Sequence, residues 1–368
     1  MKLNHYIMED VLESLIDYRG KTPKKSDEGI PALSAKSVKN GYIDYNECYY
    51  ISHEEYKRFM VRGFPKVGDV LLTTEAPMGM VARLDRDDVG IAQRLLTLRG
   101  RKGVLDNDYL LYYLQSPIGQ HKLAERETGS TVTGIKQAEF RKIEIDIPDI
   151  EIQRKIAAVL NCIDLKIEKN KHINRNLSEQ CDAIYKERFV ANSDPSWIEG
   201  RLSDLITVKY GKDHKKLEDG IIPCYGSGGV MRYVEKPIYD QESVLIPRKG
   251  TLNNVMYVDT PFWSVDTMFF TMMKMQNVAK FVYHFVKKID LASMNAGSAV
   301  PSMTTDILNA MELTIPSTEA LAGFEAGVQP MYKKMKENET ENKKLAEIRD
   351  SILPKLMSGE LDVSELNF

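Results

Sequence analysis

The sequence predicts an α/β (α+β) protein with two copies of one unit, in which a mixed domain is followed by a long helix. Three observations predict this. The two halves of the 368-residue chain resemble each other when one is shifted by 168 positions. The back part of each half carries apolar residues seven positions apart. The front part holds short strand-like runs between Gly, Pro and Asp turns. We expect the two helices to pair as an antiparallel coiled coil with pseudo-twofold symmetry.

The repeat is strongest at the back of each half. Between Ile147 and Ile184 the first copy matches the second at 11 of 38 positions without a gap. Just upstream, Gly129, Ser130 and Val132 fall on Gly297, Ser298 and Val300. Further forward small gaps are needed, but GDVLLT (68–73) still resembles ESVLIP (242–247). One unit was therefore duplicated, and its front part diverged more.

The front part of each copy predicts strands and one clear helix. The strands are expected at 70–74, 143–148, 244–247 and 312–316, and the helices at 109–115 and 278–286. NSDPS (192–196) is rich in residues that break regular structure and opens the second domain.

The back part of each copy predicts a long helix with a heptad seam. Asp149, and Ser317 or Thr318, are expected N-caps, and Gly359 is the expected stop of the second helix. The seam of the first helix contains Ile156, Leu160, Ile163, Ile167, Asn170, Asn174, Leu177, Cys181 and Ile184. That of the second contains Phe324, Val328, Met331, Met335, Asn338, Asn342, Leu345 and Ile352.

Asparagines stand at matched places in both seams, namely Asn170, Asn174, Asn338 and Asn342. A seam asparagine costs stability but fixes the register, because it requires a partner amide. The matched positions therefore predict that the helices pair with each other, which would put the two domains at opposite ends of the pair. The alternative is that each helix packs on its own domain.

These patterns divide the chain into five segments. The first domain is expected at 1–148, the first helix at 149–191, the second domain at 192–316, the second helix at 317–358, and a tail at 359–368.

Composition and motifs give no support for an enzyme. The four cysteines and six histidines lack metal spacing, so no metal is expected. Lys21-Thr22 resembles the end of a phosphate-binding loop, but its first glycine is missing. Asp194 to Trp197 resembles an amino-methyltransferase motif without the cofactor-binding glycines. The start of the chain has no signal-peptide pattern and no run is long enough to cross a membrane, so we expect a cytoplasmic protein.

Loops that combine basic and hydroxyl residues with glycine or proline suggest nucleic acid, because such side chains contact phosphates and base edges. The net charge of −3 argues against a protein that coats DNA along its whole surface. The candidate DNA contacts in the first copy are Lys21, Thr22, Lys24, Lys25, Gln93, Arg94, Gly129, Ser130, Thr131, Thr133 and Lys136. Those in the second are Lys212, His214, Lys215, Lys216, Arg248, Lys249, Thr251, Asn253, Asn254, Ser298 and Ser302.

With these features the sequence resembles the specificity subunits of type I restriction–modification systems. The most telling stretch is ETGSTVTGIKQAEFRKIEIDIPDIEIQRKIAAVLNCID (127–164), and the segments 222–234, 243–251 and 352–363 also look like family segments. The resemblance implies two target-recognition domains that each read half of a split, asymmetric DNA site. It also implies two methyltransferase subunits docked on the helices and two restriction (motor–nuclease) subunits. S-adenosylmethionine, ATP and Mg are expected on those partners, and no cofactor on this chain.

The chain departs from the family pattern in a few places. The usual Glu-Gln pair at the helix start is Ile152-Gln153 here, and the second copy, TEALAGF (318–324), lacks the Gln. Pro330 is expected to kink the second helix. The alternative function is an interaction scaffold that uses the coiled coil and does not bind DNA. A self-sufficient methyltransferase is disfavoured by the missing cofactor motifs.

Overall fold

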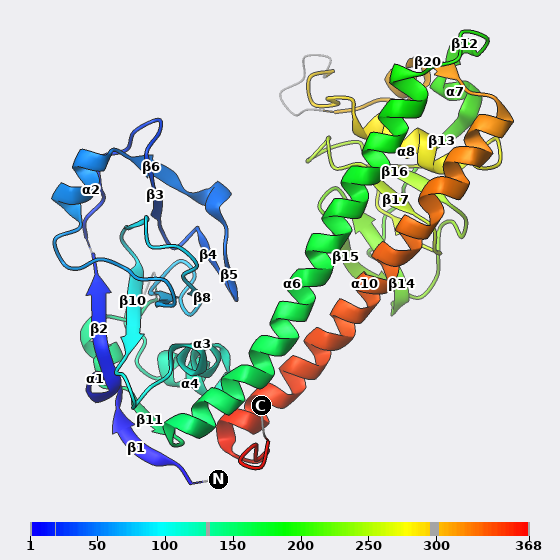
Figure 1. Ribbon diagram of the computed structural model, residues 1–368. Coiled ribbons are helices and arrows are strands. Elements are labelled where there is room, and N and C mark those ends of the chain that lie inside the picture. The colour runs from blue at the N-terminus through cyan, green and yellow to red at the C-terminus, as the bar shows by residue number, and fades with distance from the viewer. Residues whose placement is uncertain (1, 19, 130–132, 295–301, 367–368) are drawn as a thin grey trace. The chain divides into compact units, whose positions relative to one another are not determined.

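The computed structural model describes residues 2–18, 20–129, 133–294 and 302–366. Contacts divide the chain into a first unit, Met1–Asn170 with Thr340–Phe368, and a second unit, Lys171–Glu339. Each unit holds one α/β domain and parts of both long helices, α6 (Ile150–Lys186) and α10 (Thr318–Ser358), drawn in green and in orange to red in Figure 1. A short π-helical turn, Glu187–Ala191, follows α6.

The first domain is built on a four-stranded antiparallel sheet in the order β2-β10-β7-β8. Its strands are β2 (Leu12–Asp17), β10 (Leu95–Gly100), β7 (Val70–Thr73) and β8 (Val81–Arg83). Smaller sheets are β6-β3-β9 (Tyr49–Ile51, Ile30–Leu33, Gly90–Ile91), β4-β5 (Val38–Lys39, Tyr42–Ile43) and β1-β11 (Asn4–Ile7, Glu144–Ile147). The helices are α1 (Met8–Val11), α2 (His53–Phe59), α3 (Asn107–Gln115), α4 (Pro117–Ala124) and α5 (Gln137–Arg141), with a 3-10 turn at Tyr45–Glu47.

The second domain repeats this topology. Its main sheet has the order β13-β19-β16-β17 (Ile206–Tyr210, Met268–Met273, Ser243–Pro247, Met256–Val258). The second sheet is β15-β14-β18 (Gly229–Val234, Asp219–Gly226, Trp263–Ser264), and β12 (Ile198–Arg201) pairs with β20 (Glu312–Ile315). The helices are α7 (Leu202–Leu205), α8 (Ala279–Lys287) and α9 (Thr305–Asn309). The predicted strands and helices are confirmed within a residue or two.

The two domains differ mainly in the segment between the first and second strands of the main sheet. β7 begins 58 residues after the start of β2, whereas β16 begins 37 residues after the start of β13. The longer segment of the first domain accommodates β4, β5 and α2. The front parts of the two copies therefore differ partly because the first domain has extra residues between two strands of the shared sheet.

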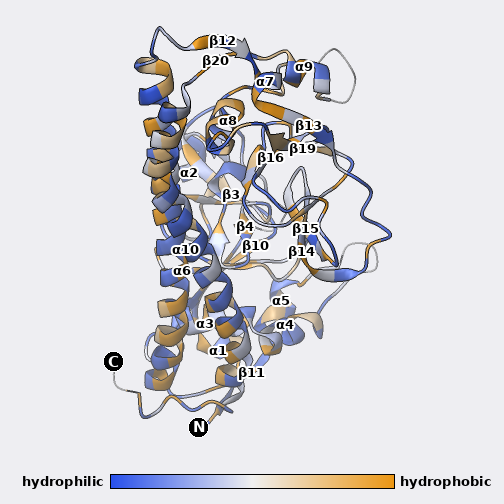
Figure 2. Ribbon diagram, turned by 90° about the vertical axis from the view of Figure 1, so that its right-hand side faces the viewer, coloured by the Kyte–Doolittle hydropathy of each residue, from blue (hydrophilic) through white to orange (hydrophobic). Residues whose placement is uncertain are grey.

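Each domain shares its hydrophobic core with the long helices of its unit. In the first unit Ile156 of α6 and Leu356 of α10 join the cluster around Tyr109 of α3. In the second, Tyr185 and Phe324 join the cluster around Phe281 of α8. Figure 2 shows apolar residues recurring along both helices between hydrophilic ones. A helix buries such a stripe only when it packs against a partner surface.

The helices also pair with each other, and in each unit they run antiparallel. In the first unit Asn170 Nδ2 donates to Asn342 Oδ1 at 2.9 Å, and in the second Asn338 Nδ2 donates to Asn174 Oδ1 at 2.8 Å. A shift of 168 residues relates Asn170 to Asn338 and Asn174 to Asn342, so the two hydrogen bonds are equivalent in the repeat. None of the seam residues is exposed. The antiparallel pairing is confirmed, and the alternative was right only in that each helix also packs on its own domain.

The ends of α10 follow the sequence signals. Ser317 Oγ accepts a hydrogen bond from the Ala320 amide at 3.2 Å, as an N-cap does, and Gly359 follows the last turn with φ of +80°. The helix α10 continues through Pro330 without a break. In the described part of the chain, no helix is long and apolar enough to cross a membrane.

Candidate nucleic-acid interface

Three segments of the first domain meet at one point, which we call the loop crossing. The Thr74 amide donates to the Arg94 carbonyl, and the Ile135 amide donates to the Thr74 carbonyl, both at 3.0 Å. Glu75 forms an isolated β-bridge with Gly134. A Cβ on Gly134 would lie 2.5 Å from the Thr74 carbonyl oxygen, so this close approach requires glycine.

The second domain has the same loop crossing. The Arg248 amide donates to the Thr267 carbonyl and the Met303 amide to the Arg248 carbonyl, both at 2.9 Å, and Lys249 bridges to Ser302. Every contact of the first crossing thus has a counterpart after β16. The β-sheet fixes two of the segments, and the segment before the last short helix, α5 or α9, supplies the third.

The side chains at the two crossings differ. In the first, Arg94 Nε lies 3.6 Å from Glu75 Oε1, with side-chain exposures of 47% and 27%. In the second, the Arg248 guanidinium stacks over Tyr210 at 5.4 Å from the ring centroid. Both arginines stay accessible. Such a site can present donors and, through Glu75, an acceptor to a base edge or a phosphate.

Most of the predicted loop residues of the two crossings are therefore brought together. Lys136 is exposed at the N-cap of α5, and the loop before it is closed by reciprocal backbone hydrogen bonds between Thr128 and Gly134. The predicted residues at or beside a crossing are Gln93, Arg94, Gly129, Thr133, Lys136, Arg248, Lys249, Thr251 and Ser302. Ser130, Thr131 and Ser298 lie outside the described residues.

The remaining basic loop is placed differently in each domain. In the first, the Lys24 amide donates to Glu55 of α2 at 2.9 Å and Lys25 lies over the Tyr49 ring of β6, so Lys21, Thr22, Lys24 and Lys25 sit beside these elements. In the second, the Lys212 amide donates to the Ser264 carbonyl at 2.8 Å, just before Thr267. Lys212 lies close to the crossing, followed by the turn with His214, Lys215 and Lys216.

Two predicted contact residues hold their own loop together. Asn253 Nδ2 donates to Asp290 Oδ1 at 2.9 Å, and its Oδ1 accepts from the Ala292 amide at 3.0 Å. Asn254 Nδ2 donates to the Ser227 carbonyl at 2.8 Å. These amides fix the loop after Lys249, and their role as DNA contacts remains a prediction.

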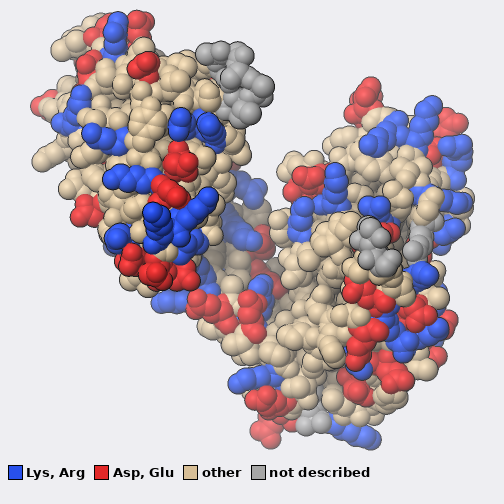
Figure 3. Space-filling view, turned by 180° about the vertical axis from the view of Figure 1, so that it is seen from behind, with Lys and Arg blue, Asp and Glu red and all other residues tan. Residues whose placement is uncertain are grey.

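The sequence analysis did not single out Glu75 and Tyr210, which contact the two arginines of the crossings, because it looked for basic, hydroxyl and amide side chains. Aligning 68–73 with 242–247 and continuing without a gap would have set Glu75 opposite Lys249. Figure 3 shows that Lys and Arg on the visible face of each domain are interspersed with Asp and Glu. On this face the charged side chains therefore form no continuous basic surface.

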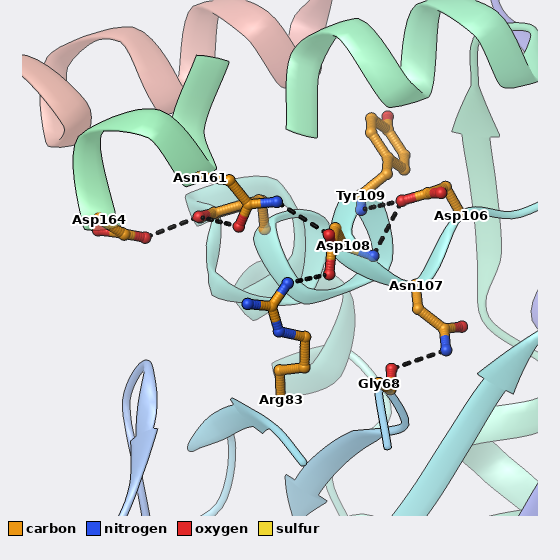
Figure 4. A network of polar contacts seen from close by, with 9 residues as sticks. Gly68, Arg83, Asp106, Asn107, Asp108, Tyr109, Asn161 and Asp164 are labelled. Atoms are coloured by element: carbon orange, nitrogen blue, oxygen red, sulfur yellow. Dashed lines mark hydrogen bonds and ion pairs between the residues drawn. The ribbon is translucent and has the colours of Figure 1, made fainter. Parts of the chain in front are cut away.

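A polar network holds the first domain against its helices (Figure 4). Asp108 of α3 accepts from Arg83 at 2.6 Å and from Asn161 of α6 at 2.9 Å. Asp164 accepts from the Tyr112 hydroxyl at 2.7 Å. Burial and the nearby Asp164 raise the pKa of Tyr112, so the hydroxyl keeps its proton and donates.

The second domain uses different residues for the same purpose. The buried Lys280 of α8 pairs with Glu325 of α10 at 2.5 Å. His284 lies between Asp182 Oδ1, 2.6 Å from its Nδ1, and the Tyr332 hydroxyl, 3.0 Å from its Nε2. Burial lowers the pKa of His284 to about 4, against the opposing effect of Asp182. A neutral ring that donates from Nδ1 and accepts at Nε2 satisfies both partners.

Comparison with known proteins agrees with this arrangement. A family model described as "Type I restriction modification DNA specificity domain" matches residues 6–179 and 196–349. The specificity subunit of the type I restriction enzyme MjaIX from Methanocaldococcus jannaschii is 26% identical, with 92% of this chain and 88% of the relative covered. That of the enzyme HindI from Haemophilus influenzae is 21% identical, with 80% and 87% covered.

Among solved structures, the type I restriction–modification S subunit from M. genitalium matches with a TM-score of 0.64 at 18% identity, covering 97% of this chain and 96% of that one. This likeness concerns the fold: two α/β halves, each followed by a long helix. Since the family model covers both halves of the chain, the protein belongs to the type I restriction–modification specificity family, as a non-catalytic DNA specificity subunit.

Proposed function

We propose that each domain reads one half of a split, asymmetric DNA site through its loop crossing. The observation that carries the proposal is the repetition of the same backbone crossing with different side chains. An identical scaffold would present both domains to DNA in the same way, whereas Arg94 and Glu75 in one and Arg248 and Lys249 in the other would select different bases. The segment boundaries predicted from the sequence (1–148, 149–191, 192–316, 317–358, 359–368) serve as the working division of the chain.

Around each crossing, the predicted lysines and hydroxyl residues would bind phosphates and set the register of the domain on the duplex. Lys136 in the first domain and Lys212 in the second are exposed beside the crossings and suit this role. Because the net charge of the chain is −3, much of the phosphate affinity would come from partner chains.

The partners in this proposal are two methyltransferase subunits that dock on the helices and two restriction subunits that join them, in the cytoplasm. S-adenosylmethionine, ATP and Mg would be held by those subunits. The support is family membership, together with relatives named as specificity subunits of type I restriction enzymes.

The test has two parts. The chain is purified with the methyltransferase subunit of its host, and its retention of duplex DNA is measured against salt concentration. The methylome of the host is then sequenced with and without this gene. We expect a methylated split site that disappears with the gene. If the complex retains no DNA and the methylome does not change, the chain is a coiled-coil scaffold and the proposal is wrong.

A further inference from the structure

Glu75 and Lys249 occupy the same position in the two crossings. Thr74 and Arg248 bind the other two segments through their backbone amide and carbonyl. Glu75 directly follows Thr74, and Lys249 directly follows Arg248. Each forms the bridge to the third segment, at Gly134 or Ser302. The backbone therefore delivers these two side chains from equivalent places in the two domains.

Their hydrogen-bonding chemistry is opposite. An ionised glutamate only accepts hydrogen bonds, and a lysine ammonium only donates them. A carboxylate in a DNA-binding loop is repelled by phosphates, so its favourable partner on a duplex is a base edge with an amino group, above all cytosine N4. The ammonium suits the O6 and N7 acceptors of guanine.

The surroundings of Glu75 support a reading role. Its contact with Arg94, at 3.6 Å with both side chains partly exposed, contributes little to folding, because solvent screens an ion pair at the surface. The arginine instead holds the carboxylate near the crossing. In the second domain the preceding Arg248 is held on Tyr210, so that Lys249 is the exposed side chain of the pair.

We propose that Glu75 and Lys249 are equivalent specificity-determining residues. Glu75 accepts a hydrogen bond from the cytosine amino group in the major groove of one half-site, and Lys249 donates to guanine in the other. The inference rests on the proposed function of one half-site per domain. Beyond that function, the inference names the base at one position of each half-site, cytosine for Glu75 and guanine for Lys249.

The experiment uses the complete complex of this chain with its host's methyltransferase subunits. The complex methylates a pool of duplexes with randomised sequence, and the methylated molecules are sequenced. With Glu75→Lys, one position of one half-site should change from cytosine to guanine, with a preference of about 5- to 150-fold. Glu75→Gln should change the same position to adenine, because a carboxamide pairs with adenine N6 and N7. Lys249→Glu should change the other half-site.

Glu144→Lys is the matched control, since Glu144 is exposed on β11 of the same domain and the charge change is the same. It should leave both half-sites unaltered. If both Glu75 variants keep the original sequence, or weaken methylation of all duplexes alike, Glu75 is not a reader and the inference is wrong. The proposed function survives that result as long as the unmodified complex selects a split site. If the unmodified complex selects no sequence, the proposed function itself fails.

Discussion

The two arginines at the crossings test the proposal that each domain reads one half-site, which we call the two-reader model. Arg94→Ala should alter recognition of one half-site only, and Arg248→Ala recognition of the other. A lost base contact should cost about 1–3 kcal/mol at one position, whereas a lost phosphate contact should weaken all sequences alike and reduce the salt slope by about 1. Binding of duplexes with single substitutions in each half-site measures both. Equal effects of either variant on both half-sites would contradict the model.

His284 makes the stability of the second unit depend on pH. Its pKa is about 4 in the folded chain, below the ordinary 6.5, so the unfolded chain binds the extra proton more readily. Stability should therefore be complete above about pH 6.5 and fall as the pH drops from there towards 4. The facing charged groups are Asp182 of α6, Lys287 of α8 and Lys288 just after α8, and they keep their charge over this range.

Urea unfolding followed by tryptophan fluorescence suits this measurement, because both tryptophans, Trp197 and Trp263, belong to the second unit. Between pH 7 and pH 5 the unfolding free energy should fall by roughly 1–2 kcal/mol. His284→Gln, which cannot titrate, should be less stable at pH 7 but should lose much less between the two pH values. An equal loss in both proteins would assign the pH dependence to other groups.

At this scale the sequence predicted the loops better than the individual contacts. Basic and hydroxyl residues between strands singled out 128–136 and 248–254 as DNA-contacting loops. The described parts of both loops lie at or beside the crossings, and their contact with DNA stays a prediction. It could not predict that Asn253 fixes its own loop through Asp290, because that partner is 37 residues away in sequence. Glu75 was not predicted because a negative charge disfavours contact with phosphates. Its carboxylate can nevertheless accept a hydrogen bond from a base edge.

The elements were largely predictable where the pattern was long. Heptads of apolar residues extend over many turns in both copies and predicted the two long helices. The matched asparagines in the two seams then predicted the pairing of α6 with α10. The polar contacts between domain and helix did not follow, because Tyr112 of α3 and Asp164 of α6 lie 52 residues apart and pair at 2.7 Å only in the folded chain. The short sheet β6-β3-β9 and helix α2 were also missed, since short strands have weak patterns.

The seam asparagines give the element-scale prediction. Asn174→Leu removes the acceptor of the buried Asn338 amide and should destabilise the second unit by about 1–3 kcal/mol. Adding Asn338→Leu should recover most of the loss, because the pair is then apolar. Asn176→Leu, at an exposed position of α6, is the control. Urea unfolding of the unmodified chain, of Asn174→Leu, of Asn338→Leu and of the double variant completes the cycle. A double variant no more stable than Asn174→Leu would refute the pairing as the cause.

At the scale of the whole molecule, the boundary between the two contact units crosses both long helices, at 170/171 in α6 and at 339/340 in α10. The asparagine pairs lie on either side of this boundary, one within each unit. Each unit thus contains one domain, its hydrophobic core and one asparagine pair that fixes the register of the helices. If the helices set the distance between the two readers, they can be lengthened at the boundary without disturbing either reader.

The helices should therefore act as the ruler that sets the gap of the DNA site. Inserting seven residues after Lys171 and seven after Glu339 keeps the heptad register and both asparagine pairs, while it lengthens the helix pair by about 10 Å. That distance corresponds to about 3 bp of duplex at 3.4 Å each. Methylation of a library with variable gaps should then favour a gap longer by about 3 bp, with both half-site sequences unchanged. The same insertion in α6 alone breaks the register and should abolish activity. A fully active double insertion with the original gap preference would show that the helices do not set the gap.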